Sequence, residues 1–211
     1  MKILTIAFGA AALAVPAMAS AATYLPTGPQ LNVALSTVTG GGWTLCHQST
    51  MAESFGNSAA NTLAGCGGNR LLLAGRETGS SNLLALAQTT KVNALANTGA
   101  SNNGVFTSSD GSDWFNADGW SWGFKPIGEA MDKFQCDFSP PVNGSVCIHT
   151  IAGVGGFSIN GITGFSGNYE RLVFTDLGAA VPEPSTWAMI VLGFGALGGA
   201  MRRRKVAVSY A

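Results

Sequence analysis

Charged residues are scarce in this sequence, and their scarcity excludes several classes of protein. Only 10% of the 211 residues are charged, with 11 basic and 11 acidic side chains, whereas globular proteins average roughly a quarter. A coiled coil or a long charged helix needs many more charges than this. A nucleic-acid-binding domain needs Lys and Arg clustered on one face, so the sequence predicts no nucleic-acid partner.

Metal-ligand spacings and internal repeats are also lacking. The chain has two histidines and four cysteines, without a C-x-x-C pair, so the ligand spacing of a zinc site is absent. No self-similarity is present at a period of about 20–50 residues, which excludes solenoids and propellers. We therefore expect neither a firm metal site nor a repeat architecture.

Glycine and apolar residues, by contrast, are abundant. The chain contains 29 glycines, is 46% hydrophobic and 9% aromatic, and has a formal net charge of zero. This composition gives the chain enough apolar surface to bury and argues against disorder. Its length predicts one main domain. We expect a mainly β (or α+β), sandwich-like exported domain.

The N-terminus has the pattern of a secretory signal peptide. Lys2 precedes an apolar run from Ile3 to Val15, and Ala17-Met18-Ala19 forms an A-x-A cleavage pattern. Cleavage after Ala19 would make residues 1–19 the signal peptide, with Ala21 as the second choice. The expected partners of this segment are the Sec translocon and signal peptidase.

The C-terminus has the pattern of a short membrane anchor. Pro182 and Pro184 mark a linker, and residues 187–201 are uncharged and apolar. These 15 residues span roughly 22 Å as a helix, and Trp187 with the cations of residues 202–205 would extend their reach. The pattern predicts a single transmembrane helix over 187–201, a basic stop-transfer segment at 202–205, and a short cytoplasmic extension at 206–211.

This tail resembles the PEP-CTERM sorting domain. The resemblance covers residues 181–205 and rests on Val-Pro-Glu-Pro-Ser-Thr-Trp-Ala-Met, the glycine-rich apolar segment and the arginine cluster. It is closest to the variant with Trp-Ala after Pro-Glu-Pro, which also carries the label "ice-binding protein C-terminal domain". The extension at 206–211 departs from the pattern.

The resemblance implies a Gram-negative exported protein that an exosortase recognises and processes. It implies transient anchoring in the inner membrane, followed by release to the cell surface or the extracellular space, in a context of exopolysaccharide and biofilm. The residues that carry these sorting roles are Pro182, Glu183, Pro184, Trp187, Arg202, Arg203 and Arg204.

Residues 20–180 form the expected exported domain. Six basic residues stand against ten acidic ones there, a net charge of −4. All four cysteines lie in this segment, and an even number in an oxidising compartment predicts two disulfides. Among the three connectivities we favour Cys46–Cys66 with Cys136–Cys147, because both close short loops. The alternative is a metal site that combines these cysteines with His47 and His149.

The pattern of apolar residues predicts strands in most of this domain. We expect a hairpin in which a strand at 31–38 turns at 40–42 and returns at 43–47, and a second hairpin from 71–75 to 83–87. Further strands are expected at 146–151 and 171–175, and helices at 50–63 and 91–96. The segment Gly40-Gly-Gly-Trp-Thr-Leu45 resembles the opening of fibrinogen-like C-terminal domains and intelectin-type lectins.

Three groups of residues are candidates for chemistry or binding. The string Gly119-Trp-Ser121-Trp-Gly123 matches the G-x-S-x-G nucleophile elbow, with Asp137 and His149 downstream, but Pro126 argues against the helix that should follow. Oxygen ligands for calcium are possible at Asp110, Asp113, Asn116 and Asp118, with a solvated turn as the alternative. Glycan contact is possible at Trp114, Trp120 and Trp122, with burial in the core as the alternative.

These patterns predict a non-enzymatic protein of the cell envelope without catalytic residues. The expected role is in an extracellular matrix or in contact with glycans. The alternative is a secreted carbohydrate-active hydrolase with the same sorting tail. No cofactor is expected apart from the calcium considered above.

Overall fold

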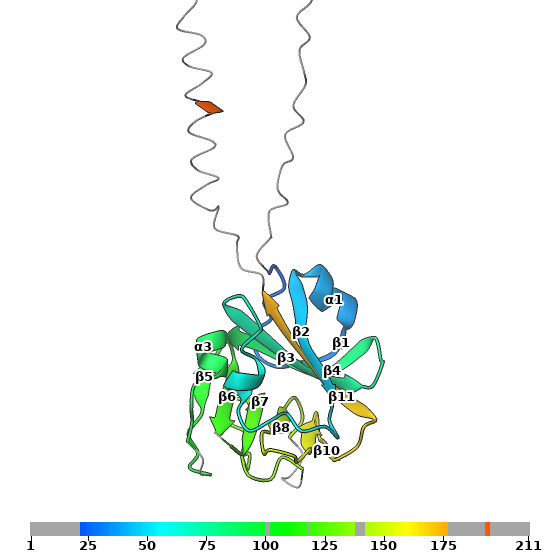
Figure 1. Ribbon diagram of the computed structural model, residues 1–211, viewed down its shortest axis with the longest axis vertical. Helices are drawn as coiled ribbons and strands as arrows, with labels where there is room; N and C mark the ends of the chain where they lie inside the picture. Colours follow the sequence, from blue (N-terminus) through cyan, green and yellow to red (C-terminus); the bar gives the residue numbers. More distant parts are fainter. Residues whose placement is uncertain (1–21, 100–101, 118, 138–141, 177–192, 195–211) are drawn as a thin grey trace, which may run out of the picture. The chain divides into compact units, whose positions relative to one another are not determined.

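The computed structural model describes residues 22–99, 102–117, 119–137, 142–176 and 193–194. The chain divides into two units, residues 1–178 and 179–211. The predicted signal peptide and the sorting residues of the tail lie outside the described residues, as does the extension at 206–211. The first unit, shown in Figure 1, contains two antiparallel sheets.

The first sheet has five strands in the order β1-β4-β3-β11-β2. The strands are β1 (Gln30–Ala34), β2 (Trp43–Thr50), β3 (Arg70–Glu77), β4 (Asn82–Thr90) and β11 (Tyr169–Asp176). β11 is the last strand in the chain and lies between β3 and β2, pairing with both over its length. The predicted hairpin of residues 71–75 and 83–87 is confirmed as β3–β4, and the predicted strand at 171–175 as β11.

The second sheet is a six-stranded meander, with neighbours in the order β10-β9-β8-β7-β6-β5. Its strands are β5 (Thr107–Ser109), β6 (Ser112–Ala117), β7 (Ser121–Pro126), β8 (Val146–His149), β9 (Phe157–Ile159) and β10 (Ile162–Gly164). The strand expected at 146–151 is β8, which ends two residues earlier. The predicted mainly β architecture with two layers is therefore confirmed.

The main core lies between the two sheets. Alternate residues of β3 and β11, such as Leu71, Leu73 and Val173, point into it and meet Trp114 and Trp122 of the second sheet. Side chains alternate between the faces of a strand, so the residues between them point outward. A Cβ atom at Gly75 would lie 2.8 Å from the side chain of Ile159, so the sheets approach closely where that glycine faces β9.

The outer face of the first sheet carries a second apolar cluster. Leu72, Ala74 and Phe174 contribute from the strands, and Val38 and Trp43 cover them. The indole nitrogen of Trp43 donates a hydrogen bond to the carbonyl of Tyr24 at 2.7 Å. This ties the segment before β1 to the start of β2.

The hairpin predicted from 31–38 to 43–47 is wrong. β1 ends at Ala34, and helix α1 (Leu35–Gly40) follows it. β1 pairs with β4, and β2 pairs with β11, so these two strands form opposite edges of one sheet. The chain turns into a helix because Val38 is then fully buried over the sheet. The other predicted helices are confirmed only as short turns, α2 (Ala59–Thr62) and α3 (Lys91–Ala94).

Candidate functional site

Both predicted disulfides are present. Cys46 of β2 is bonded to Cys66, with Cα atoms 5.3 Å apart, and Cys136 is bonded to Cys147 of β8, with Cα atoms 5.4 Å apart. The alternative of a metal site with His47 and His149 is wrong, because the thiolates it requires are used in these bonds. In the part of the chain that the structure describes, no three His, Cys, Asp or Glu side chains form a group that could hold a metal ion.

The three candidate tryptophans occupy two different environments. Trp114 and Trp122 are fully buried between the sheets, and the indole nitrogen of Trp122 donates to the carbonyl of Ala94 at 2.8 Å. Their assignment to glycan contact is therefore wrong, because neither ring has surface for a ligand. Trp120 lies in the turn between β6 and β7, and 41% of its surface is exposed. It is the candidate that remains.

The predicted calcium ligands are not brought together. Asp110 forms an ion pair with Arg70 at 2.8 Å. Asp113 and Asn116 differ by an odd number of positions on β6, so they point to opposite faces of the second sheet. Asp118 lies outside the described residues. The grouping of the three described residues around one ion is wrong.

Each of these polar side chains has a structural partner instead. Asp113 is mostly buried and pairs with Lys125 across β6 and β7 at 2.6 Å. Burial raises the pKa of Asp113, but hydrogen bonds from Lys125 and Ser108 together with the charge of Lys125 outweigh burial and leave this pKa below its usual value. The amide of Asn116 donates to the carbonyl of Leu95 at 3.0 Å. Asp113 therefore ties β6 to β7, and Asn116 ties β6 to the end of α3.

The G-x-S-x-G string does not form a nucleophile elbow. Ser121 is the first residue of β7, is fully buried, and is followed by strand rather than helix. His149 is its cross-strand partner on β8, and Asp137 Oδ1 lies 3.1 Å from His149 Nε2. The three residues predicted from the motif are thus neighbours, but the Ser121 hydroxyl has no hydrogen bond to His149.

The imidazole of His149 also lacks the alignment of a catalytic base. Its contact with Asp137 has ion-pair distance without hydrogen-bond geometry, so both ring nitrogens are buried without a hydrogen-bond partner. Its Nδ1 faces Gly156, on the side of β8 away from β7. A general base has to reach the proton that it removes, and this one points away from Ser121.

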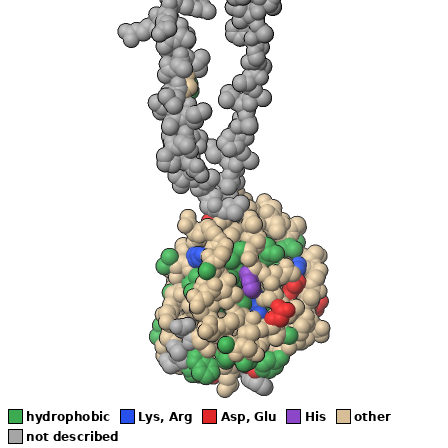
Figure 2. All heavy atoms as spheres, in the orientation of Figure 1, with side chains coloured by type: hydrophobic (Ala, Val, Ile, Leu, Met, Phe, Trp, Pro, Cys, Tyr) green, Lys and Arg blue, Asp and Glu red, His purple; other side chains and the backbone are tan. Residues whose placement is uncertain are grey.

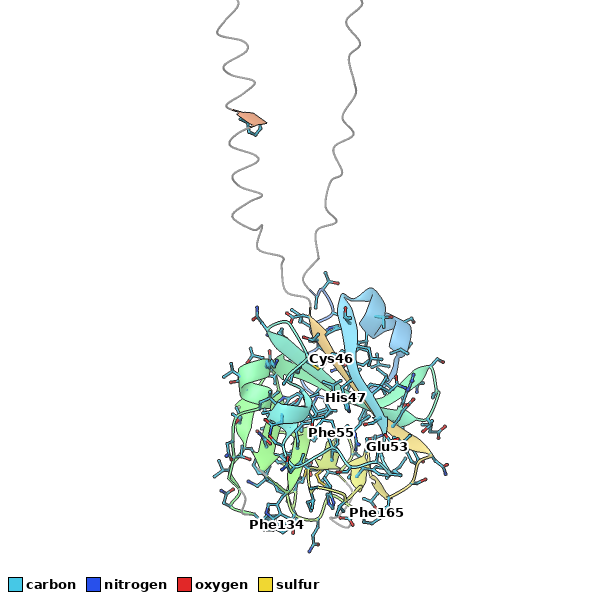
Figure 3. The ribbon with its side chains drawn as sticks, viewed as in Figure 1. Cys46, His47, Glu53, Phe55, Phe134 and Phe165 are labelled. Atoms are coloured by element: carbon cyan, nitrogen blue, oxygen red, sulfur yellow. A yellow bond between two sulfur atoms is a disulfide. The ribbon has the colours of Figure 1, made fainter. Side chains whose placement is uncertain are left out.

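Trp120 is exposed and forms an aromatic pair with the half-buried Phe134. Its ring centroid lies 4.7 Å from that of Phe134, with the planes inclined at 52°. Its backbone is fixed on both sides, since its N–H donates to Ala117 at 2.8 Å and its carbonyl accepts from Thr150 at 2.9 Å. In Figure 3, Phe134 and Phe165 lie toward the end of the domain remote from α1.

A buried arginine near β2 gave no signal in the sequence. Arg171 of β11 is fully buried, donates to Ser49 Oγ and to the carbonyl of Glu53, both at 2.7 Å, and lies over the ring of Phe55. Burial lowers the pKa of Arg171 to about 10, although the charge of Glu53 opposes this shift. Its contacts hold the loop after β2 against the sheet, which is a structural role.

His47 completes this group and is half-buried at the surface (Figure 3). Its Nε2 is 3.0 Å from Ser49 Oγ, and its ring meets Phe55 edge-on. Because Ser49 Oγ accepts a hydrogen bond from Arg171, its own hydroxyl hydrogen is available to donate to the imidazole. Burial and then the charge of Arg171 lower the pKa of His47, and Glu53 opposes them. A neutral imidazole fits this arrangement.

On the face that Figure 2 shows, most of the described surface is backbone or uncharged polar side chains, with a few charged groups and scattered apolar side chains. Among the described residues, no helix is long and apolar enough to cross a membrane. The fold and the paired cysteines therefore define a disulfide-containing, mainly β domain with two sheets.

Comparison with known families identifies the tail of the chain. Residues 180–205 match the PEP-CTERM protein-sorting motif, which confirms the resemblance seen in the tail. This motif implies export, anchoring in the membrane before processing, and exosortase as the processing partner. No curated protein and no solved structure matches the chain.

Proposed function

We propose that this chain is a non-enzymatic protein of the cell surface or extracellular matrix whose β-sandwich contacts glycans. The observation that carries the proposal is the sorting motif at residues 180–205, which follows directly after the folded domain. Exosortase would cut near Pro182-Glu183-Pro184, while residues 187–201 serve as the transient anchor and Arg202–Arg204 as the stop-transfer charge.

Two features of the domain support this proposal. Paired cysteines are typical of proteins that fold in an oxidising compartment. The matrix role is supported by the exposed ring of Trp120, since aromatic rings offer flat apolar surface with a polar edge to ligands.

The sorting step can be tested by mass spectrometry of the mature protein. We expect cells with exosortase to produce a chain that lacks residues after the cut, and cells without exosortase to retain the Ala211 end. Glu183→Ala should retain that end even with exosortase present, whereas Ser185→Ala serves as the matched control. An intact Ala211 end in both kinds of cell would refute exosortase processing.

One observation favours the alternative of a secreted carbohydrate-active hydrolase. Ser121 and His149 are cross-strand neighbours on the second sheet and Asp137 contacts His149 from the loop before β8, although the three are not aligned for proton transfer. We expect the purified protein to hydrolyse neither esters nor glycans. Turnover that Ser121→Ala abolishes while the Tm stays within a few degrees would establish the hydrolase instead.

A further inference from the structure

We propose that Trp120 and Phe134 form a preorganised platform that stacks against one pyranose ring of a neutral glycan. This inference rests on the proposed function, because it assigns the glycan contact to a defined site. The other two candidate tryptophans are fully buried, so the platform is a specific surface and not the aromatic-rich segment as a whole.

The chain is held in place both before and after Phe134. The Lys133 side chain is fully buried, and its Nζ donates to Asn103 Oδ1 at 2.7 Å and to the carbonyl of Val105 at 3.2 Å. Two residues after Phe134, Cys136 is bonded to Cys147 of β8. Phe134 is therefore held in place beside Trp120. Binding to a ring that is already fixed costs little conformational entropy.

The exposure of Trp120 leaves its ring available to a ligand. The residue has a large ring and is 41% exposed, and the centroid of the Phe134 ring lies 4.7 Å from that of Trp120. The two rings touch each other rather than facing across a gap, so they form a single surface and not an aromatic cage for a cation. A flat ligand with an apolar face fits such a surface, and the face of a pyranose ring meets this description.

An unpartnered polar group lies next to the backbone of Trp120. The carbonyl of Trp120 accepts a hydrogen bond from the N–H of Thr150, whose buried hydroxyl has no partner. Buried polar groups are normally hydrogen-bonded, so this hydroxyl has unused capacity to bind an ordered water beneath the platform.

The charge of the protein near the platform favours neutral over anionic glycans. The segment from Ile127 to Asp137 carries the exposed carboxylate of Glu129 and the half-buried carboxylate of Asp132, whereas its lysine side chain before Phe134 is buried. An acidic surface without an accessible cation on this segment repels uronic acids and sulfated sugars. A neutral hexose polymer is the class that remains.

The test is affinity electrophoresis of the mature, exported protein in native gels that contain one polysaccharide each. The neutral probes are laminarin, hydroxyethylcellulose and galactomannan, and the anionic probe is alginate. We expect at least one neutral probe to retard the wild type and alginate not to. Trp120→Ala should weaken the dissociation constant at least about tenfold, which corresponds to about 1.4 kcal/mol, and Phe134→Ala should weaken it less.

Val92→Ala is the matched control, because Val92 is 79% exposed on α3 and lies outside the platform. Trp120→Phe should retain part of the affinity, and thermal melting verifies that each variant is folded. Retardation that Trp120→Ala leaves unchanged would overturn this site while the glycan role stands. Retardation by alginate alone would overturn the neutral class, and retardation by none of the probes would overturn the glycan role together with the site.

Discussion

The two outer faces of the sandwich are covered in different ways. On the first sheet, apolar side chains of the strands are buried under Val38, Trp43 and neighbouring apolar residues. On the second sheet, a small apolar cluster around Phe115 includes the Cys136–Cys147 disulfide, and it lies beside the buried Lys125–Asp113 ion pair.

The outer face of the first sheet is purely structural, whereas the outer face of the second sheet can also hold side chains in position for binding. The first cover is stabilised by removal of apolar area from water, which has no directional requirement. The second relies on a covalent bond and charged hydrogen bonds, which fix individual side chains in position. The exposed ring of Trp120 packs against Phe134, which lies in the segment that these bonds fix. Three predictions probe the comparison.

The largest effect on stability is expected from the apolar cluster on the outer face of the first sheet. Trp43→Ala removes a ring that is 2% exposed, together with its hydrogen bond to Tyr24, and should lower the free energy of unfolding by about 4 kcal/mol. Urea denaturation followed by circular dichroism measures this change. Leu45→Ala on the same strand is the control, since Leu45 is 41% exposed. Equal losses in the two variants would contradict the apolar account of this face.

A smaller loss is expected when the covalent fastening of the second face is removed. The double variant Cys136→Ser/Cys147→Ser opens a loop with a sequence separation of 11 residues and should lower the free energy of unfolding by about 3 kcal/mol. It should also increase hydrogen exchange in the segment around Phe134, measured by mass spectrometry. Hydrogen exchange that rises in α1 instead would show that the outer faces of the two sheets are coupled in stability.

The smallest effect concerns the acid stability of the charged groups on each side. Asp113 on the second sheet and Glu170 on the first both have pKa values below their usual range. For Glu170, burial raises the pKa, but hydrogen bonds from Gly79, Gln48 and Arg76 with the charge of Arg76 outweigh burial. The unfolded chain therefore binds protons more readily than the folded one. The resulting stability is present above about pH 4.3 and is lost as the pH falls through the folded pKa values.

The measurement is the Tm between pH 6 and pH 2.5 for the wild type, Asp113→Asn and Glu170→Gln. Each variant should lose about 1.5 kcal/mol at pH 6, because a hydrogen bond to a charged group is replaced by a weaker one. Each should then show a flatter decline of Tm with acid than the wild type does. A decline as steep as that of the wild type in both variants would show that other carboxylates carry the acid sensitivity.

The parts of the fold that follow from local patterns were predictable. Leu71–Gly75 and Leu83–Ala87 indicate a hairpin because two apolar runs flank turn residues, and the disulfides follow from the preference for short loops. The region of α1 was not predictable, since Leu31, Val33, Leu35 and Val38 fit both a strand and a helix. Only the burial of Val38 over the sheet decides between them.

The candidate site was predictable only in part. An aromatic segment with a period of two does not reveal which face is buried, so Trp120 could not be separated from Trp114 and Trp122. Their difference depends on Trp120 lying in a turn before β7. Likewise Asp113 has the carboxylate that a calcium ligand needs, but its cross-strand partner is Lys125. The pairing of residues on different strands cannot be predicted from their spacing in the sequence.

The position of β11 has a mechanical consequence. This strand ends at Asp176, a few residues before the sorting motif at 180–205, so tension on a tethered tail is transmitted to it first. β11 pairs with β3 and β2 through seven residue pairs on each side. A pull along the strand loads both ladders in shear at once, and extraction needs them to break together. The rate of forced unfolding is set by the unfolding barrier, so the domain is attached to its tail through a strand whose pairing on both sides resists force.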